Sequence, residues 1–418
     1  MHHFQYRNGD LYCEEVRISD IAEAVATPFY LYSHATLTRH FRVFDEAFSR
    51  VPHIVCFSAK SNSNISILST FGKLGSGADV VSGGELYRAL QANIEPKRIV
   101  FSGVGKTRSE MEFALEVGIL MFNVESEGEI MVLNNCAFKL NLKAPLSLRV
   151  NPDVDPKTHP YIVTGLRKNK FGVEGRDALR LYLLAKDLPN IEIVGIDCHI
   201  GSQVTEIEPF VDALIHLKEL ISELEGKGIE LKYIDLGGGL GITYDQEEPP
   251  HPNIYAENII DHLKGLSHTL ILEPGRVIVG NAGILVTKVL YTKRHQEKNF
   301  VIVDAGMNDL IRPSLYGSYH AIQPVEKKDR DKIVADVVGP ICESGDFLAK
   351  DRIIPEVKPG ELLAVMSTGA YGFAMASNYN SRRRSAEILV KGDKFFVIRE
   401  REEYQDLIRG ESIPPFLL

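Results

Sequence analysis

The sequence of 418 residues has no apolar run that approaches the ~20 residues needed to span a bilayer. Its first residues, MHHFQYRNGDLYCEEV, also lack the apolar core of a secretory signal. We therefore expect no membrane contact and a cytoplasmic location. No CxxC pair occurs, so we predict reduced thiols, with neither a disulfide framework nor a metal site. The five cysteines are scattered, at Cys13, Cys56, Cys136, Cys198 and Cys342.

A surplus of positive charge is also absent. Lys and Arg number 47 against 56 Asp and Glu, which gives a formal net charge of −9. This balance argues against general nucleic-acid binding but leaves room for a local basic pocket. The sequence has no internal repeat and no low-complexity segment, and a hydrophobic content of 44% excludes a largely disordered chain.

Between about residues 53 and 276, short apolar segments alternate with helix-like stretches. Such alternation predicts a parallel sheet, and eight units match a closed (β/α)₈ barrel. An open doubly wound sheet is the alternative, but no GxGxxG follows the first strand. The expected strands are His53–Ala59, Gly77–Val80, Arg98–Ser102, Leu120–Val124, Leu146–Val150, Glu192–Cys198, Tyr233–Leu236 and Thr269–Leu272.

Other elements are expected on both sides of this barrel. We expect Ser33 to be the N-cap of a first helix, whose apolar face carries Leu37, Phe41 and Phe44. After about Gly280, segments rich in β-branched residues predict an antiparallel β domain that ends in a hairpin at KGDK. We expect the N-terminal strands to join it. The expected domains are residues 1–32, 33–278 and 279–418.

Polar residues follow several of these strands, at the barrel end where the active sites of such barrels lie. Lys60 follows the first strand, and Asp79 and Ser82 close the second. The alternatives are a solvated lysine and an N-cap of the next helix. His199 and Ser202 follow the sixth strand. A histidine there suits a ligand contact, although a core histidine is the alternative.

The last two strands end in residues suited to an anion. A glycine turn, Gly237, Gly238 and Gly239 with Gly241, follows the seventh strand, and such turns let backbone amides approach a phosphate. Glu273 and Arg276 close the eighth strand. An amine, a flat histidine ring, an acid and a phosphate cradle are what pyridoxal 5′-phosphate (PLP) requires. Lysine forms a Schiff base with its aldehyde, and the acid keeps its ring nitrogen protonated.

The chain resembles the fold-type III PLP-dependent decarboxylases, and among them the diaminopimelate-specific members. The resemblance runs from FYLYS to the last hairpin, and it implies an α/β fold with a barrel and a β domain. Ser58 and Ser61 stand beside Lys60 where many members have Tyr or Ala. The matching segments are AKSNSN, GADVVSGGEL, NKFG, HIGSQ, DLGGGLGI, EPGR, IRPSLYGSYH, GPICESGD and GAYGFAMASNYNSR.

The resemblance implies a role for each cofactor residue. Lys60 would hold PLP with Asp79 nearby, His199 would stack on the ring, and Glu273 would pair with the pyridine nitrogen. The phosphate would be bound by Ser202, Gly237, Gly238, Gly239, Gly275 and Arg276, and Tyr371 would reach both phosphate and substrate.

The implied reaction is the decarboxylation of meso-2,6-diaminopimelate to L-lysine and CO₂, the last step of lysine biosynthesis. Arg276, Arg312 and Tyr316 would bind the distal carboxylate, and Glu343 the distal ammonium. Cys342 would return a proton to the carbanion. Cys342 and Glu343 would come from the neighbouring subunit, so the implied active unit is a homodimer.

Three alternatives differ in identifiable features. A decarboxylase of ornithine, arginine or a carboxylated polyamine shares the barrel, but Arg312 would repel a distal ammonium. A racemase of the same barrel needs two opposed acid/base groups, one of which is usually a tyrosine, whereas Cys342 in GPICESGD favours decarboxylation. A cofactor-carrier protein would lack the β domain of residues 280–418.

Overall fold

The computed structural model describes residues 2–154, 170–295 and 298–418, so Asn169 of the NKFG motif lies outside the described residues. The contacts divide the chain into two compact units. One consists of Thr38–Val279, and the other joins Met1–Leu37 to Gly280–Leu418.

The first unit is the predicted barrel. Eight strands pair in parallel, and the sheet closes because β8 pairs with β9 and β13 pairs with β5. All eight predicted strands are confirmed within a few residues, and the open sheet is excluded. The strands are β5 (His53–Ser58), β6 (Gly77–Val80), β7 (Ile99–Phe101), β8 (Met121–Val124), β9 (Ala144–Asn151), β11 (Ile191–Asp197), β12 (Tyr233–Asp235) and β13 (Thr269–Leu272), with a short β10 (Val173–Glu174) beside β9.

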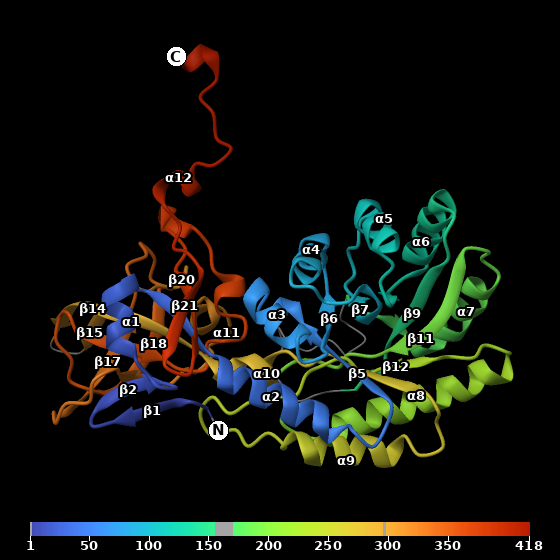
Figure 1. Cartoon of the computed structure of the whole chain (residues 1–418), viewed down its shortest axis with the longest axis horizontal. Helices are drawn as coiled ribbons and strands as arrows, with labels where there is room; N and C mark the ends of the chain where they lie inside the picture. Colours follow the sequence, from blue (N-terminus) through green and yellow to red (C-terminus); the bar gives the residue numbers. More distant parts are fainter. Residues whose placement is uncertain (1, 155–169, 296–297) are drawn as a thin grey trace. The chain divides into compact units, whose positions relative to one another are not determined.

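Helices lie around these strands (Figure 1). Buried side chains from five strands, including Val100, Met121 and Ile271, fill part of the barrel interior, as expected for a packed barrel. The helices are α2 (His34–Ala47), which begins in the other unit, α3 (Ile65–Gly72), α4 (Gly83–Gln91), α5 (Arg108–Val117), α6 (Glu127–Leu140), α7 (Gly175–Lys186), α8 (Glu208–Gly226), α9 (Pro252–His262) and α10 (Arg276–Val279).

The predicted N-cap of α2 is present. The Ser33 hydroxyl accepts a hydrogen bond from the amide of Thr36 at 3.0 Å. Leu37, Phe41 and Phe44 are buried, as the helical spacing of the apolar residues predicts.

The second unit is a β domain with one small and one large sheet. The small sheet is antiparallel and holds β1 (Phe4–Arg7), β2 (Asp10–Cys13) and β3 (Val16–Arg17). The large sheet contains β4 (Phe29–Ser33), β14 (Gly283–Arg294), β15 (Asn299–Val303), β16 (Ile322–Pro324), β17 (Lys332–Val338), β18 (Phe347–Pro355), β19 (Leu362–Val365), β20 (Ala386–Lys391) and β21 (Lys394–Arg399). The unit also has α1 (Ile18–Val25), α11 (Arg312–Tyr316) and α12 (Tyr404–Leu407).

The large sheet is mixed, whereas the sequence predicted an antiparallel one. The KGDK turn does join β20 and β21 as an antiparallel hairpin. However, β4 pairs in parallel with β20, and β15 pairs in parallel with β17. A tight turn forces an antiparallel neighbour, whereas strands separated by a long connection can pair in either direction.

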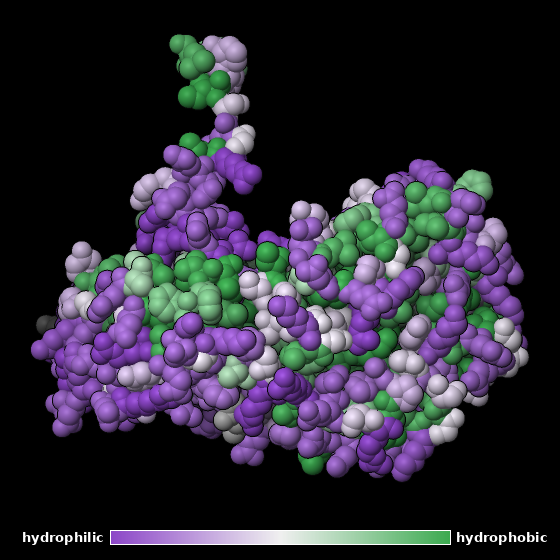
Figure 2. Space-filling view, in the orientation of Figure 1, coloured by the Kyte–Doolittle hydropathy of each residue, from purple (hydrophilic) through white to green (hydrophobic). Residues whose placement is uncertain are grey.

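Hydrophilic side chains cover most of the face shown in Figure 2. Within the described ranges, no helix combines the length and the apolarity required to cross a bilayer.

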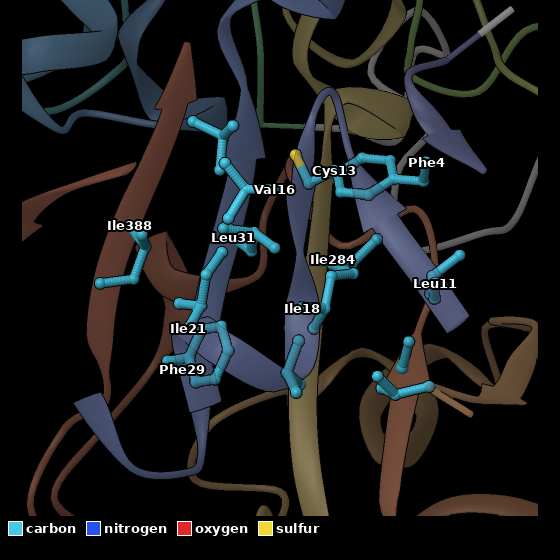
Figure 3. Packing of buried hydrophobic residues seen from close by; sticks show 14 of the residues in the cluster. Phe4, Leu11, Cys13, Val16, Ile18, Ile21, Phe29, Leu31, Ile284 and Ile388 are labelled. Carbon is cyan, nitrogen blue, oxygen red and sulfur yellow. The ribbon is translucent and has the colours of Figure 1, made fainter. Parts of the chain in front are cut away.

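The N-terminal strands join the β domain as predicted. Leu31 of β4 lies in one buried cluster with Ile284 of β14 and Ile388 of β20, and Ile18 and Ile21 of α1 pack against them (Figure 3). Segments more than 250 positions apart in the sequence therefore share one core.

Candidate active site

Lys60 lies at the carboxyl end of the first barrel strand. It follows β5 in a short 3-10 helix, and its Nζ is 2.5 Å from Oδ2 of Asp79. Asp79 is fully buried in β6, directly beside Ser58 of β5 in the strand register. The Ser58 hydroxyl lies 2.8 Å from the same carboxylate oxygen. The lysine is therefore an ion-paired group at the barrel end, and Asp79 orients its amine.

Ser82 has a structural role instead. Its hydroxyl accepts from the amide of Glu85 at 3.2 Å and caps α4, which was the alternative considered for this segment.

His199 follows β11 and is held as a neutral ring. Its Nδ1 accepts a hydrogen bond from the amide of Gly238 at 3.1 Å, so that nitrogen carries no proton. Burial lowers the pKa of His199 well below its usual value, and the positive charges of Arg149 and Lys60 lower it further. The backbone of the loop after β12 therefore fixes the uncharged imidazole ring of His199, which belongs to the loop after β11.

The glycine turn after β12 leaves no space for side chains. A Cβ on Gly238 would lie 2.1 Å from the carbonyl oxygen of Glu273, and one on Gly237 would lie 2.6 Å from Nδ1 of His199. Gly239 has φ +120°, and its Cβ would lie 2.5 Å from the carbonyl oxygen of Gly201. The loops after β11, β12 and β13 thus meet backbone to backbone at this turn.

The amides of the first two glycines are already engaged. Gly237 donates to Oδ1 of Asp235 at 2.9 Å, and Gly238 donates to His199. These two amides are therefore not available to an anion. Gly237 and Gly238 instead allow the backbone to come close to a bound group, which fits a cradle for a phosphate.

Arg276 begins α10 and is buried between two neighbours. Its Nη2 donates to Oγ of Ser202 at 2.9 Å, and its Nη1 donates to the hydroxyl of Tyr244 at 2.6 Å. The structure thus brings Ser202 and Arg276 together from the loops after β11 and β13. Tyr244 was not predicted, although its position after the glycine turn was a usable signal.

Glu273 is a buried acid at the end of β13. Burial raises the pKa of its carboxyl well above the usual value, and the nearby carboxylates Asp235 and Asp79 raise it further. Such a site favours a cationic partner, because a positive charge would stabilise the ionised acid. A protonated pyridine nitrogen is a partner of this kind, so the donor set fits PLP.

The sequence patterns did not predict a polar network that lies inside the barrel. Asn123 of β8 donates to Oδ2 of Asp235 at 3.0 Å and to the Ser102 hydroxyl at 3.1 Å, which in turn lies 3.4 Å from Oε1 of Glu273. Burial raises the pKa of Asp235 to about 8. The signal was available, because these polar residues lie in or directly after barrel strands.

A buried ion cluster also lies at the ends of the barrel strands. Nη1 of Arg149 lies 3.2 Å from Oε1 of Glu125, and its Nε lies 3.9 Å from Oδ2 of Asp197. Arg149 therefore places a positive charge among the carboxylates near Glu273 and partly offsets their repulsion.

We expect Gly238→Ala to weaken PLP binding at least about tenfold, because the new methyl group would collide with the Glu273 carbonyl and displace both loops. Titration of the apoprotein with PLP, followed by absorbance, measures the effect. Gly226→Ala is the matched control, since its Cβ would meet no atom within 4 Å. Equal affinities in the two variants would contradict the role of this turn.

The remaining predicted residues lie in the β domain, and Arg312 is the most buried of them. It begins α11, where its Nε lies 3.4 Å from Nε2 of His320 and its Nη2 lies 3.3 Å from Oγ of Ser318. Its guanidinium carbon is 5.9 Å from the centre of the Tyr316 ring. His320 is anchored in turn, because its Nδ1 lies 2.9 Å from the Met366 carbonyl oxygen.

Cys342 and Glu343 lie on a loop tied to α11. The Ser314 hydroxyl of α11 donates to the Gly345 carbonyl oxygen at 2.5 Å. Cys342 is exposed, and its amide donates to Oδ1 of Asn380 at 2.8 Å. A hydrogen bond to Glu343 raises the pKa of Tyr379.

Tyr371 follows in the same domain, with a left-handed backbone at φ +57°. The next residue is Gly372, where a Cβ would lie 2.3 Å from the Thr368 carbonyl oxygen. The predicted residues thus form two groups, one in each unit. The barrel carries Lys60 to Arg276, and the β domain carries Arg312 to Tyr371.

Comparison with known proteins gives a consistent family. Residues 34–280 match the family model described as "Pyridoxal-dependent decarboxylase, pyridoxal binding domain". The chain is 51% identical over 417 residues to a diaminopimelate decarboxylase of Vibrio cholerae, which covers 99% of this chain and 100% of that relative.

Solved structures agree with the sequence relatives. A diaminopimelate decarboxylase from Helicobacter pylori, complexed with L-lysine, is 46% identical with a TM-score of 0.91, covering 94% of this chain and 98% of the other. Another from M. jannaschii, in co-complex with L-lysine, is 39% identical with a TM-score of 0.95, covering 99% of each chain. The chain therefore belongs to the diaminopimelate decarboxylases, a family of PLP-dependent carboxy-lyases.

Proposed function

We propose that the barrel of residues 33–278 binds PLP through the residues described above, and that the chain converts meso-2,6-diaminopimelate to L-lysine and CO₂ as a cytoplasmic homodimer. The observation that carries this proposal is the convergence of Lys60, Glu273 and the His199–Gly238 pair at the carboxyl end of one barrel. Bound PLP supplies an electron sink for the pair of electrons left when CO₂ departs.

The residues of the chain would hold the cofactor in place and set the charges around it. Lys60 would hold the cofactor through its amine, which Asp79 orients from 2.5 Å. Glu273 would keep the pyridine nitrogen protonated, because an ionised acid in a buried site stabilises an adjacent positive charge. His199 would support the ring face as a neutral group, since Gly238 occupies its Nδ1. Ser202, Gly239, Gly275 and Arg276 would surround the phosphate.

Substrate choice depends on the β-domain group. Diaminopimelate carries an amino-acid group at each end, so its distal end needs a partner for a carboxylate and another for an ammonium. Arg312 with Tyr316, and Arg276 from the barrel, would bind the carboxylate, and Glu343 would bind the ammonium. An ornithine or lysine substrate has only the distal ammonium, and a buried arginine would repel it.

Cys342 would supply the proton that replaces CO₂ on the substrate carbon. The thiol is exposed on its own chain, unlike the buried Cys13, Cys56 and Cys198. We propose that Cys342 and Glu343 act at the barrel of a second copy, while Tyr371 reaches the phosphate and the substrate.

The direct test is the visible absorption spectrum of the purified protein with PLP, followed by CO₂ release from meso-diaminopimelate, ornithine, arginine and lysine. We expect an absorption band of bound cofactor and a preference for meso-diaminopimelate. A faster reaction with a substrate that lacks the distal carboxylate would contradict the specificity that we assign to Arg312.

Mixing two inactive variants tests the shared site. After complete exchange of Lys60→Ala with Cys342→Ala subunits, half of the dimers are mixed and each has one intact site, so about a quarter of all sites should be active. Mixing Lys60→Ala with the double variant Lys60→Ala/Cys342→Ala is the control and should recover nothing. If native mass spectrometry shows mixed dimers without activity, the sharing of sites between subunits is wrong.

A further inference from the structure

The last residues of the chain form an exposed apolar segment that the proposed chemistry does not use. We call residues 408–418 the C-terminal arm. Its large apolar side chains are mostly exposed, at 66% for Ile413, 84% for Phe416 and 92% for Leu418. Figure 2 shows hydrophobic atoms at the far end of this projecting segment. The backbone hydrogen bonds donated by residues 411, 417 and 418 stay within the arm.

The composition and backbone of the arm suit it to binding an apolar protein surface. Its final seven residues, SIPPFLL, carry no side-chain charge. Pro414 and Pro415 restrict the backbone, and residues 415–417 form a short 3-10 helix. A segment with few accessible conformations loses less entropy when it binds a surface.

The root of the arm is fastened to one loop of the β domain. Glu402 accepts from Nε of Arg384 at 2.7 Å and from the Arg384 amide at 2.8 Å. It also accepts from Nδ2 of Asn378 at 2.5 Å. We call residues 378–384 the anchor loop.

The anchor loop also holds the two residues assigned to the second copy. Its Asn380 accepts a hydrogen bond from the amide of Cys342 at 2.8 Å, and Glu343 is the next residue in the chain. The Cys342–Glu343 pair and the arm are therefore mounted on the same short segment. A subunit that contributes this pair to another barrel therefore has the root of its arm, at Glu402, close to that contact.

We propose that the C-terminal arm docks on a second copy of this chain, the copy whose barrel receives Cys342 and Glu343, and strengthens their association. This rests on the shared site of the proposed function. A membrane is a weaker candidate, because stable anchoring takes two signals and the last seven residues supply apolar contact without basic residues.

The test compares subunit association in three forms of the PLP-bound protein of residues 1–418. They are the wild type, a Phe416→Ser/Leu417→Ser arm variant, and Phe138→Ser as the control. Phe138 on α6 is 71% exposed, so the control removes a similar apolar side chain at a distant place in the sequence. Dimer dissociation constants come from sedimentation at several concentrations, and the cofactor band shows that the barrel is intact. We expect association at least tenfold weaker in the arm variant only.

A photo-crosslinking residue at position 416 provides a second measurement that needs no loss of stability. Cross-links between a mass-labelled and an unlabelled copy support the proposal. The proposal is overturned if the cross-links stay within one copy, or if the dissociation constants of all three forms are equal. Binding of the arm to vesicles without cross-links between copies also overturns it. The subunit-mixing experiment distinguishes the docking of the arm from the sharing of the active site. Recovered activity together with an unchanged dissociation constant rejects the docking of the arm but not the shared site. Failure of mixing rejects the shared site and, with it, the assignment of the arm to the copy that receives Cys342 and Glu343.

Discussion

Replacing Lys60 by alanine is expected to abolish the visible absorption band of bound PLP and to lower turnover at least about 1,000-fold, which corresponds to roughly 4 kcal/mol in the barrier. The reason is that Lys60 provides the amine that would hold the cofactor. Asp79 sits 2.5 Å from it and no longer has a cation to orient in the variant. A spectrum of the PLP-saturated variant and the rate of CO₂ release from meso-diaminopimelate measure both effects.

The control for this experiment is Lys73→Ala. Lys73 is an exposed residue just after α3, so its loss should leave the spectrum and the rate unchanged. Retention of the cofactor band in Lys60→Ala would remove Lys60 from the mechanism. Loss of the band in both variants would indicate that general unfolding, and not the missing amine, explains the result.

Replacing Arg312 by alanine is expected to reduce kcat/KM for meso-diaminopimelate about 100-fold, or about 2.7 kcal/mol, without changing the cofactor band. The variant lacks the buried guanidinium group, so the distal carboxylate of the substrate would lose its positively charged partner. Arg312→Lys should restore only part of the activity, because an ammonium cannot reproduce the contacts that the guanidinium makes with Ser318 and His320.

Arg294→Ala is the matched control, since Arg294 is an exposed arginine of β14 paired with Glu356. Its substitution should leave kcat/KM within about twofold of the wild type. Arg312 does not set the substrate preference if Arg312→Ala and Arg294→Ala behave alike. Loss of the cofactor band in Arg312→Ala would likewise show that the residue acts on the cofactor and not on the substrate.

Local pattern was sufficient for most of the barrel. The eight strands are short apolar runs between helical segments, and each was located within a few residues because the pattern is local and repeated eight times. The large sheet of the β domain was less accessible. Its parallel pairs, β4 with β20 and β15 with β17, join strands whose partners no local signal identifies.

The same division holds for the site. Lys60, His199, Ser202, Glu273 and Arg276 could be named because each follows a barrel strand, where active-site residues gather. Ser82 was flagged on the same basis but caps α4. Asn123, Asp235 and Arg149 were not predicted. A single polar residue in an apolar strand carries no sign of its partner in the sequence, and only the structure shows that these side chains meet inside the barrel.

Alternating short-range pattern and the chemistry of a few residue types were enough to predict an α/β barrel, a β domain and a set of candidate residues for PLP. Tertiary structure alone revealed which atoms meet: the amide of Gly238 on His199, the Ser202 hydroxyl on Arg276, and the Asn123 network leading to Glu273. The physical reason is range. Periodicity and turn preference act over a few residues, whereas these contacts join residues up to 171 positions apart and depend on the closure of the barrel.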